Sequence, residues 1–169
     1  MLAASLAAIL TRDLRALARE VEAYPDDDLP WRVPPGIANS GGNLVLHLCG
    51  NLQYLVGTQL GATGYARDRD AEFTQRGLSR QELVARIGTT LAVVERTLAD
   101  VSEERLAEDF PMVLNGRRVR TGDLLMHLAT HLAYHLGQLD YHRRLVSGGG
   151  GPVGAMLLAE LASAREVPE

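Results

Sequence analysis

The sequence has very little cysteine: Cys49 is the only one in 169 residues. A single thiol cannot form an intramolecular disulfide and cannot build a thiolate metal cluster. This scarcity fits a reducing compartment, and we expect a cytoplasmic protein. Cys49 lies about 200° around the predicted helix from His47, so we expect it to pack as a small apolar residue rather than to act as a nucleophile.

Long apolar runs and an excess of basic residues are also missing. No segment has 18 uncharged apolar residues, and the N-terminal stretch MLAASLAAILTRDLRAL carries charges from Arg12 onward with no basic region before it. We therefore expect neither a membrane span nor a signal sequence. With 17 basic and 21 acidic residues, the net charge of −4 argues against nucleic-acid binding, which usually requires a basic face.

Several common catalytic motifs are absent as well. The chain shows no internal repeat, phosphate-binding loop, nucleophile elbow or paired acid-base carboxylates. Its composition, 46% hydrophobic and 22% charged, is ordinary for a globular protein. The length suits one domain spanning residues 1–169 with a sizeable core.

Apolar periodicity predicts four amphipathic helices, near residues 2–23, 40–60, 80–99 and 121–147. Asn39-Ser40 offers an N-cap for the second, Ser79 and Glu82 form a capping box for the third, and Thr121 is expected to cap the fourth. These helices predict an all-α fold, a four-helix bundle with a long crossover connection.

Two smaller elements are expected around the fourth helix. Residues 110–119, with Asn115-Gly116 at the centre, predict a minor hairpin before it. After the Gly148 to Gly151 linker, Pro152 is expected to open a short extra C-terminal helix through Ala164.

Two connecting segments have alternative interpretations. Trp31, in a proline-rich loop, is expected to cover one end of the bundle rather than to form a substrate platform. The charged segment RDRDAEF (67–73) is typical of a solvated connection. Alternatively, Arg67 and Arg69 could hold a carboxylate or phosphate of a ligand near the mouth of the bundle.

Histidine is concentrated in one place: four of the five lie in LLMHLATHLAYHLGQLDYHRRL (124–145), at positions His127, His131, His135 and His142. At about 100° per residue they fall within an arc of roughly 80° on one helix face. They cannot all bind one ion, because His142 lies roughly 10 Å beyond His135 along the helix and His127 roughly 12 Å before it. Spacing alone leaves two candidate metal-binding pairs, His127 with His131 or His131 with His135.

The alternative is that these histidines are satisfied by hydrogen bonds on the surface or in the core. Three imidazoles at successive steps of four on a leucine-rich helix favour a metal site, because buried unpaired imidazoles are costly. His47, on the second predicted helix, is the only histidine outside this cluster. By itself it is typical of a core imidazole, but as a third ligand it would leave a metal position open.

Three segments together resemble the DinB-like superfamily of metal-binding four-helix bundles: NSGGNLVLHLCGNLQYLVG, RDRDAEF and HLATHLAYHLGQLDYHRRL, covering most of residues 39–146. In that family one ligand comes from the second helix and two from a His-x-x-x-His-x-Gly-Gln segment. The resemblance implies that His47, His131 and His135 bind the metal and that His127 is only a neighbour. Gln138, about 60° around the helix from His135, is better placed than the adjacent Tyr134 for a role beside the metal or substrate.

Three neutral nitrogens leave the charge of a divalent ion largely uncompensated, so the ion acidifies a bound water or thiol. Zinc or nickel is expected, and iron or manganese also suits such a site. Characterised relatives of the fold include a bacillithiol S-transferase and a mycothiol-dependent maleylpyruvate isomerase. The resemblance therefore implies a metal-dependent thiol transferase, with Arg67 or Arg69 as candidates to bind carboxylates of the thiol.

Other activities and assemblies stay open. The same ion could serve a metal-dependent hydrolase, or the protein could be a non-catalytic metal-binding or small-ligand-binding stress-response protein. We expect a homodimer, because the first helix is apolar over Met1 to Leu10 beyond what one bundle face needs and relatives pair through helices.

Overall fold

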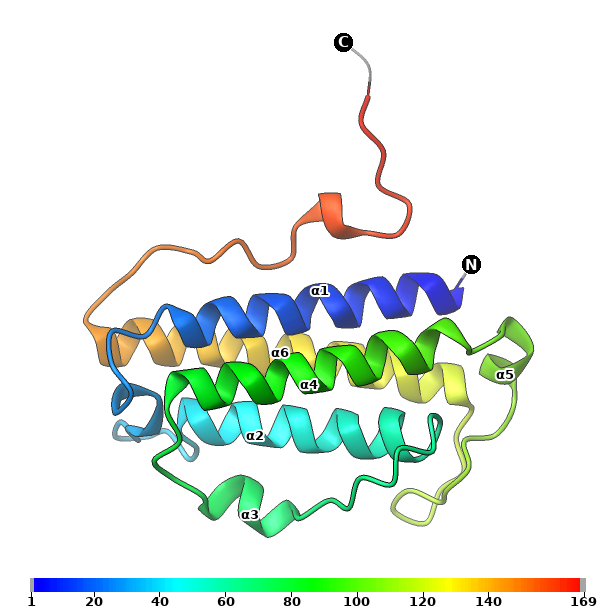
Figure 1. Ribbon diagram of the computed structural model, residues 1–169, viewed down its shortest axis with the longest axis horizontal. Coiled ribbons are helices and arrows are strands. Elements are labelled where there is room, and N and C mark those ends of the chain that lie inside the picture. The colour runs from blue at the N-terminus through cyan, green and yellow to red at the C-terminus, as the bar shows by residue number, and fades with distance from the viewer. Residues whose placement is uncertain (1, 168–169) are drawn as a thin grey trace.

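Four long helices lie side by side along the length of the molecule in a computed structural model that describes residues 2–167 (Figure 1). They are α1 (Leu2–Glu22), α2 (Gly41–Leu52), α4 (Arg80–Ala99) and α6 (Thr121–Ser147). Helices α1 and α6 run in one direction, and α2 and α4 run in the other (Figure 1). No strand occurs within residues 2–167, so the predicted all-α bundle is confirmed.

Five shorter elements connect or follow these helices: η1 (Leu29–Trp31), η2 (Gln53–Thr58), α3 (Arg69–Thr74), α5 (Glu103–Ala107) and η3 (Leu158–Glu160). The π-helical η2 continues α2 and widens its last turns. The connection from α2 to α4 then returns along the bundle and carries α3 beside α2 (Figure 1). None of the helices in the described part of the chain combines the length and apolar character needed to cross a membrane.

The helix caps follow the sequence in two cases of three. The Ser40 hydroxyl accepts a hydrogen bond from the Asn43 backbone N–H, and Ser79 and Glu82 form the expected capping box. The prediction that Thr121 caps α6 is wrong: Arg120 occupies the cap position without a side-chain bond, and Thr121 is the first helical residue. The chain enters α6 from the hairpin, where the Thr121 backbone N–H donates to the Glu108 carbonyl at 2.9 Å.

The hairpin is confirmed in a reduced form. Two isolated antiparallel bridges join Asp109 to Arg120 and Leu114 to Arg117. Asn115 and Gly116 both have positive φ, at 49° and 75°, as a tight two-residue hairpin turn requires.

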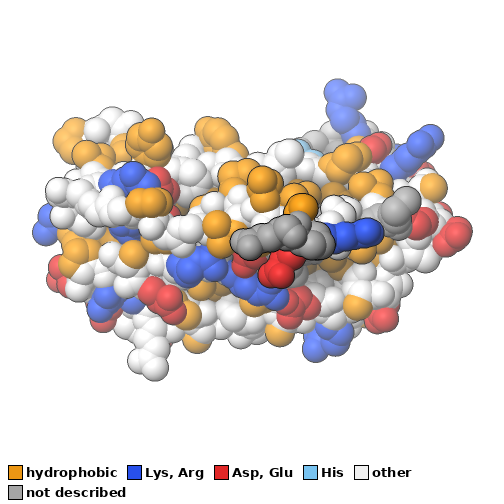
Figure 2. All heavy atoms as spheres, turned by 90° about the horizontal axis from the view of Figure 1, so that it is seen from above, with side chains coloured by type: hydrophobic (Ala, Val, Ile, Leu, Met, Phe, Trp, Pro, Cys, Tyr) orange, Lys and Arg blue, Asp and Glu red, His pale blue; other side chains and the backbone are white. Residues whose placement is uncertain are grey.

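The expected C-terminal helix from Pro152 through Ala164 does not form, and only the single 3-10 turn η3 lies there. The side chain of Arg19 donates to the backbone carbonyls of Val153 and Gly154 at 2.9 and 2.8 Å, which ties this segment to α1. Gly154 and Met156 have φ of 71° and 58°, outside the right-handed helical region. Seen from the side of α1 and the tail, the surface mixes hydrophobic side chains with arginine and acidic groups (Figure 2).

Trp31 packs where the sequence suggested. Its Nε1–H donates to the Leu78 carbonyl at 2.8 Å, and its ring lies so close to α2 that a Cβ at Gly42 would clash with it. The side chain therefore fastens the connecting loop to α2 and to the start of α4.

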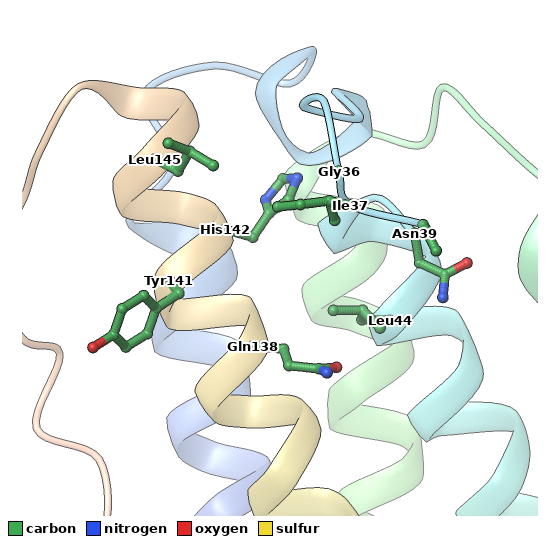
Figure 3. A pocket seen from close by; sticks show the side chains of 9 residues that line it. Gly36, Ile37, Asn39, Leu44, Gln138, Tyr141, His142 and Leu145 are labelled. Carbon is green, nitrogen blue, oxygen red and sulfur yellow. The ribbon is translucent and has the colours of Figure 1, made fainter.

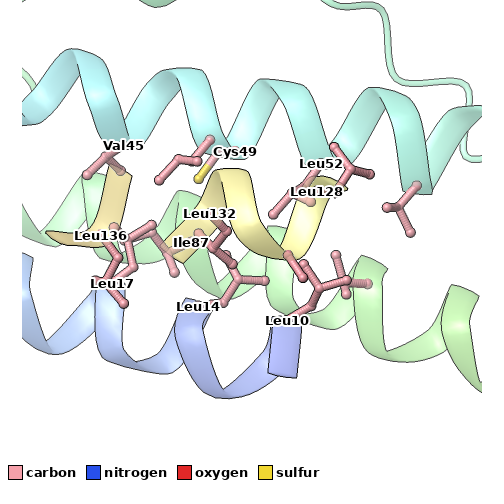
Figure 4. Packing of buried hydrophobic residues seen from close by; sticks show 14 of the residues in the cluster. Leu10, Leu14, Leu17, Val45, Cys49, Leu52, Ile87, Leu128, Leu132 and Leu136 are labelled. Atoms are coloured by element: carbon pink, nitrogen blue, oxygen red, sulfur yellow. The ribbon is translucent and has the colours of Figure 1, made fainter. Parts of the chain in front are cut away.

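The core is a layer of aliphatic side chains between the four long helices (Figure 4). Its central residues are Leu10, Leu14, Leu17, Val45, Cys49, Leu52, Ile87, Leu128, Leu132 and Leu136. On α6 each of the three leucines follows a histidine by one residue, which places the histidine stripe about 100° from the core stripe. The imidazoles of α6 therefore lie at the edge of the core.

Cys49 belongs to this core, as expected. It is 3% exposed, and burial raises the pKa of its thiol to about 11. A thiol so buried and so weakly acidic is a poor nucleophile.

Candidate metal centre

Three histidines from two helices come together at the edge of the core. His47 projects from α2, while His131 and His135 project from successive turns of α6. The Nε2 atom of His131 lies 3.3 Å from Nε2 of His47 and 3.2 Å from Nε2 of His135. Within residues 2–167 this is the one group of three or more potential ligands close enough to hold a metal ion, with ligand atoms within 4.8 Å of one another.

His47 is held by a buried carboxylate. Its Nδ1 lies 3.0 Å from Oε2 of Glu72, which is 5% exposed. The Arg67 guanidinium grips both oxygens of the same carboxylate, with Nε to Oε1 at 2.6 Å and an Nη to Oε2 at 2.8 Å. Burial acts to raise the pKa of Glu72, but the hydrogen bonds from Arg67 and His47 outweigh it and the pKa is lowered. The ionised carboxylate can only accept, so Nδ1 of His47 carries the proton and its Nε2 presents a lone pair.

The local chain explains how Glu72 reaches this position. The Asp68 side chain accepts from the Ala71 backbone N–H and so caps α3, which carries Glu72 toward α2. A Cβ at Gly50 would collide with the Glu72 carboxylate, so this glycine makes room for it on the surface of α2. Residues 67–73 are a solvated connection only in part: Asp68, Arg69 and Asp70 are exposed, whereas Glu72 is buried. Sequence reasoning missed Glu72. The signals that could have found it were the Asp68 cap and a glycine inside a helical pattern.

His135 is oriented by a second acceptor. Its Nδ1 lies 2.7 Å from the side-chain oxygen of Gln138, one turn farther along α6. The amide oxygen accepts from Nδ1–H, which again leaves Nε2 with a lone pair. Gln138 thus contacts the centre through His135, while the ring of Tyr134, 64% exposed, packs edge-on against His135 at 5.2 Å between centroids.

Without a cation, the three Nε2 atoms cannot all be paired in hydrogen bonds. His131 can donate one Nε2 proton to only one of its two neighbours, so at least one lone pair of His47 or His135 faces another nitrogen without a hydrogen. Protonation does not relieve this at neutral pH. Burial, followed by the charges of His135, His47, His127 and Arg67, lowers the pKa of His131 to about 4. Burial also lowers the pKa of His135, against the hydrogen bond to Gln138.

A divalent metal ion would satisfy all three lone pairs. Two imidazole nitrogens bound to one tetrahedral zinc ion at ~2.0–2.1 Å are about 3.3–3.4 Å apart. The observed separations from His131, 3.3 and 3.2 Å, are close to that value. A carboxylate and an amide oxygen on the far ring nitrogens are the supports that metal-bound histidines usually have. The residues present therefore fit a three-histidine metal site.

The other two histidines of α6 do not join the centre. The ring of His127 stacks on that of His131 at 6.0 Å between centroids, and its side chain is exposed. His142 is 2% exposed and uses both ring nitrogens, Nδ1 to the Tyr24 hydroxyl at 2.6 Å and Nε2 to the Arg32 carbonyl at 2.9 Å. The choice of His135 over His127, which spacing left open, agrees with this geometry.

A cavity of about 580 Å³ opens beside His131, and we call it the arginine cavity. It is lined by Asn51, Tyr54, Leu55, Arg67, Arg69, Met112, Leu114, Asn115, Leu124, His127, Leu128 and His131. The helices α2 and α6 supply two walls, and the hairpin supplies a third. His131 both lines the arginine cavity and belongs to the histidine centre, so the cavity adjoins the centre.

The two arginines of the cavity have different partners. Arg67 already forks onto Glu72, so its charge serves the histidine centre. The Arg69 guanidinium lies 5.6 Å from the Phe73 ring centroid and pairs with no carboxylate of residues 2–167. Asn51 adds a buried side-chain oxygen that accepts no hydrogen bond within the described residues. The cavity thus offers the Arg69 cation to a ligand.

Comparison with known proteins places the chain in a family. Residues 5–150 match the family described as "Protein of unknown function (DUF1572)". The chain belongs to this family. The matched region contains all three histidines, Glu72 and the arginine cavity, so the candidate site lies within the DUF1572 segment. No curated protein matches the chain.

Proposed function

We propose that this protein binds a divalent metal ion through His47, His131 and His135 and transfers a small anionic thiol to an electrophile. The observation that carries the proposal is the grouping of three histidine nitrogens within 4.8 Å of one another, with two of the rings held by acceptors on Nδ1. When bound there, a divalent ion would lower the pKa of a thiol and so supply a nucleophile near neutral pH. Zinc and nickel suit three imidazoles best, and iron or manganese also suits them.

The residues around the centre have separate tasks in this proposal. Glu72, gripped by Arg67, fixes the ring of His47, and Gln138 fixes the ring of His135. Arg69 binds a carboxylate of the thiol in the arginine cavity, because its guanidinium lacks a carboxylate partner in residues 2–167.

The thiol comes from the resemblance to the DinB-like superfamily, and the cationic cavity supports an anionic form of it. In the transfer an S–C bond forms, the bond from that carbon to its leaving group breaks with the electron pair on the leaving group, and the thiol proton passes to solvent. Hydrolysis is the alternative reaction of the same centre, with water in place of the thiol.

The first experiment measures the metal that accompanies protein purified without an affinity tag. Wild-type protein is expected to carry about one divalent ion per chain, and His131→Ala protein essentially none. Metal-loaded protein is then incubated with a panel of bacterial thiols and a haloaromatic electrophile while thiol loss is followed. Equal rates for wild type and His131→Ala, or no rate above background with any thiol, would remove the transferase in favour of hydrolysis or metal and ligand binding alone.

We also propose a homodimer in a reducing, cytoplasmic setting. The start of α1 supports the homodimer, because Leu2 is 44% exposed and small side chains of α1 line a surface hollow shared with α4. The buried free thiol of Cys49 is consistent with a reducing, cytoplasmic setting. Light scattering that reports one chain across micromolar concentrations would contradict the dimer.

A further inference from the structure

A second cavity, of about 460 Å³, lies on the other side of the metal centre along α6. It is formed between the loop before α2 and the C-terminal half of α6 (Figure 3). Its main lining residues are Ile37, Ala38, Leu44, Gln138, Tyr141 and Leu145. We call it the apolar pocket. Its volume falls within the range of small-molecule sites.

The apolar pocket differs in chemistry from the arginine cavity. None of its lining residues is an arginine or a carboxylic acid. Its one titratable imidazole, His142, has both ring nitrogens in hydrogen bonds, and burial lowers its pKa. Three hydrophobic lining side chains stay open to solvent: Tyr141 is 79% exposed, Leu145 59% and Ile37 37%. An uncharged hydrophobic ligand would remove this surface from water.

One side chain, Gln138, separates the apolar pocket from the metal centre. Gln138 lines the pocket, and its amide oxygen accepts from Nδ1 of His135 at 2.7 Å. His131, seven residues earlier on α6, lines the arginine cavity. Those seven residues span roughly 10 Å, so the two cavities flank the centre from opposite sides along the helix.

We propose that the apolar pocket binds the uncharged aromatic or alkyl group of the electrophilic substrate, while the anionic thiol occupies the arginine cavity. The role of the pocket as the binding site for the electrophile rests on the proposed transferase function. A transfer between two molecules is accelerated when the protein holds one molecule on each side of the reacting atoms. The charged cavity contains His131, and the uncharged pocket adjoins His135 through Gln138, so the two sites lie on either side of the centre. The desolvation cost of burying a charge keeps an anionic ligand out of the uncharged pocket.

The binding claim is tested without metal and without turnover. Metal-free protein is titrated with the neutral fluorescent probe N-phenyl-1-naphthylamine, and the rise in emission gives its Kd. Leu145→Glu and Ile37→Glu each place a charge on a different wall of the pocket, and both are expected to raise the Kd at least about tenfold. The matched control is Val113→Glu on the hairpin, where a hydrophobic side chain that is 49% exposed lines neither cavity. The control should leave the Kd unchanged.

The role of the pocket in binding the electrophile is tested with metal-loaded protein. Leu145→Glu should raise the KM of the haloaromatic electrophile and leave the KM of the thiol unchanged, whereas Arg69→Gln should do the reverse. If the wild type transfers no thiol but the probe still distinguishes Leu145→Glu from Val113→Glu, the transferase falls and the pocket stands as a site for an uncharged ligand. The apolar pocket is not a ligand site if the probe fails to bind, or if it binds Leu145→Glu and Ile37→Glu as tightly as it binds the wild type.

Discussion

His131 and His142 lie on the same face of the same helix, yet the structure uses them in opposite ways. Both nitrogens of His142 have protein partners, the Tyr24 hydroxyl and the Arg32 carbonyl, at 2.6 and 2.9 Å. Nε2 of His131 faces only other imidazole nitrogens, at 3.3 and 3.2 Å. A buried histidine with both ring nitrogens in hydrogen bonds has a structural role, whereas one whose Nε2 lies beside the Nε2 atoms of other histidines is a candidate metal ligand.

The difference arises from what lies opposite each residue. His142 faces the loop that leads from α1 into α2 and also Gly41, the first residue of α2, where a Cβ would meet both the Tyr24 hydroxyl and the imidazole. His131 faces α2 itself, where His47 projects. The same spacing on α6 therefore places a candidate metal ligand at one level of the bundle and a structural hydrogen bond at another.

Removing a ligand should give the largest effect. His131→Ala is expected to abolish metal binding, with at least about a hundredfold loss of affinity, because two imidazoles remain and the central nitrogen is gone. His142→Ala should keep the metal. Affinity for zinc measured by competition with a chelator decides between them, with His127→Ala as a further control that keeps full metal content. Loss of metal in His127→Ala and retention in His135→Ala would show that the wrong pair was chosen.

Loosening a ligand should come next. Glu72→Gln preserves shape but removes the carboxylate charge that holds His47 and pairs with Arg67, and we expect a loss of metal affinity of about 10–100-fold. Gly50→Ala should act in the same direction, because the added Cβ displaces the Glu72 carboxylate. Gly88→Ala is the matched control, since a Cβ there meets nothing within 4 Å. Unchanged affinity in Glu72→Gln would mean that His47 needs no carboxylate support.

His142 should matter for stability rather than for metal. His142→Ala leaves the buried Tyr24 hydroxyl without its partner and opens a cavity, and we expect the free energy of unfolding to fall by about 1–3 kcal/mol. Urea unfolding of metal-free protein measures this. If stability is unchanged while metal content drops, the assignment of His142 as structural is wrong.

The smallest effect should be a dependence on pH. Burial lowers the pKa of His142 below the usual histidine value of about 6.5, against the hydrogen bond to the Arg32 carbonyl. Below about pH 6.5 the unfolded chain therefore binds a proton that the folded protein excludes, so the stabilisation is full above that pH and is lost as the pH falls toward the lowered pKa. Urea midpoints of metal-free protein at pH 7, 6 and 5 should decline less steeply in His142→Gln than in wild type. Parallel slopes would contradict this.

Much of the scaffold follows from local pattern. The apolar periods of α1, α2, α4 and α6, the Ser40 cap and the Ser79 capping box depend on residues within one or two turns of each other, so they can be inferred from the chain. The C-terminal helix and the Thr121 cap failed because contacts from elsewhere override local preference there. Arg19 holds the tail, and the backbone N–H of Thr121 bonds to Glu108.

The sequence by itself determined that His131 and His135 share one helix face one turn apart, because helix geometry alone sets that relation. Only the tertiary structure decided that His47 meets them, that Glu72 holds the ring of His47, and that two cavities of different polarity flank the centre. Those relations join α2, α3, α6 and the hairpin, and no local periodicity specifies the distance between side chains on separate elements. They follow from the packing of the bundle, in which Gly50 admits Glu72 and the leucines of α6 place the histidine stripe at the edge of the core.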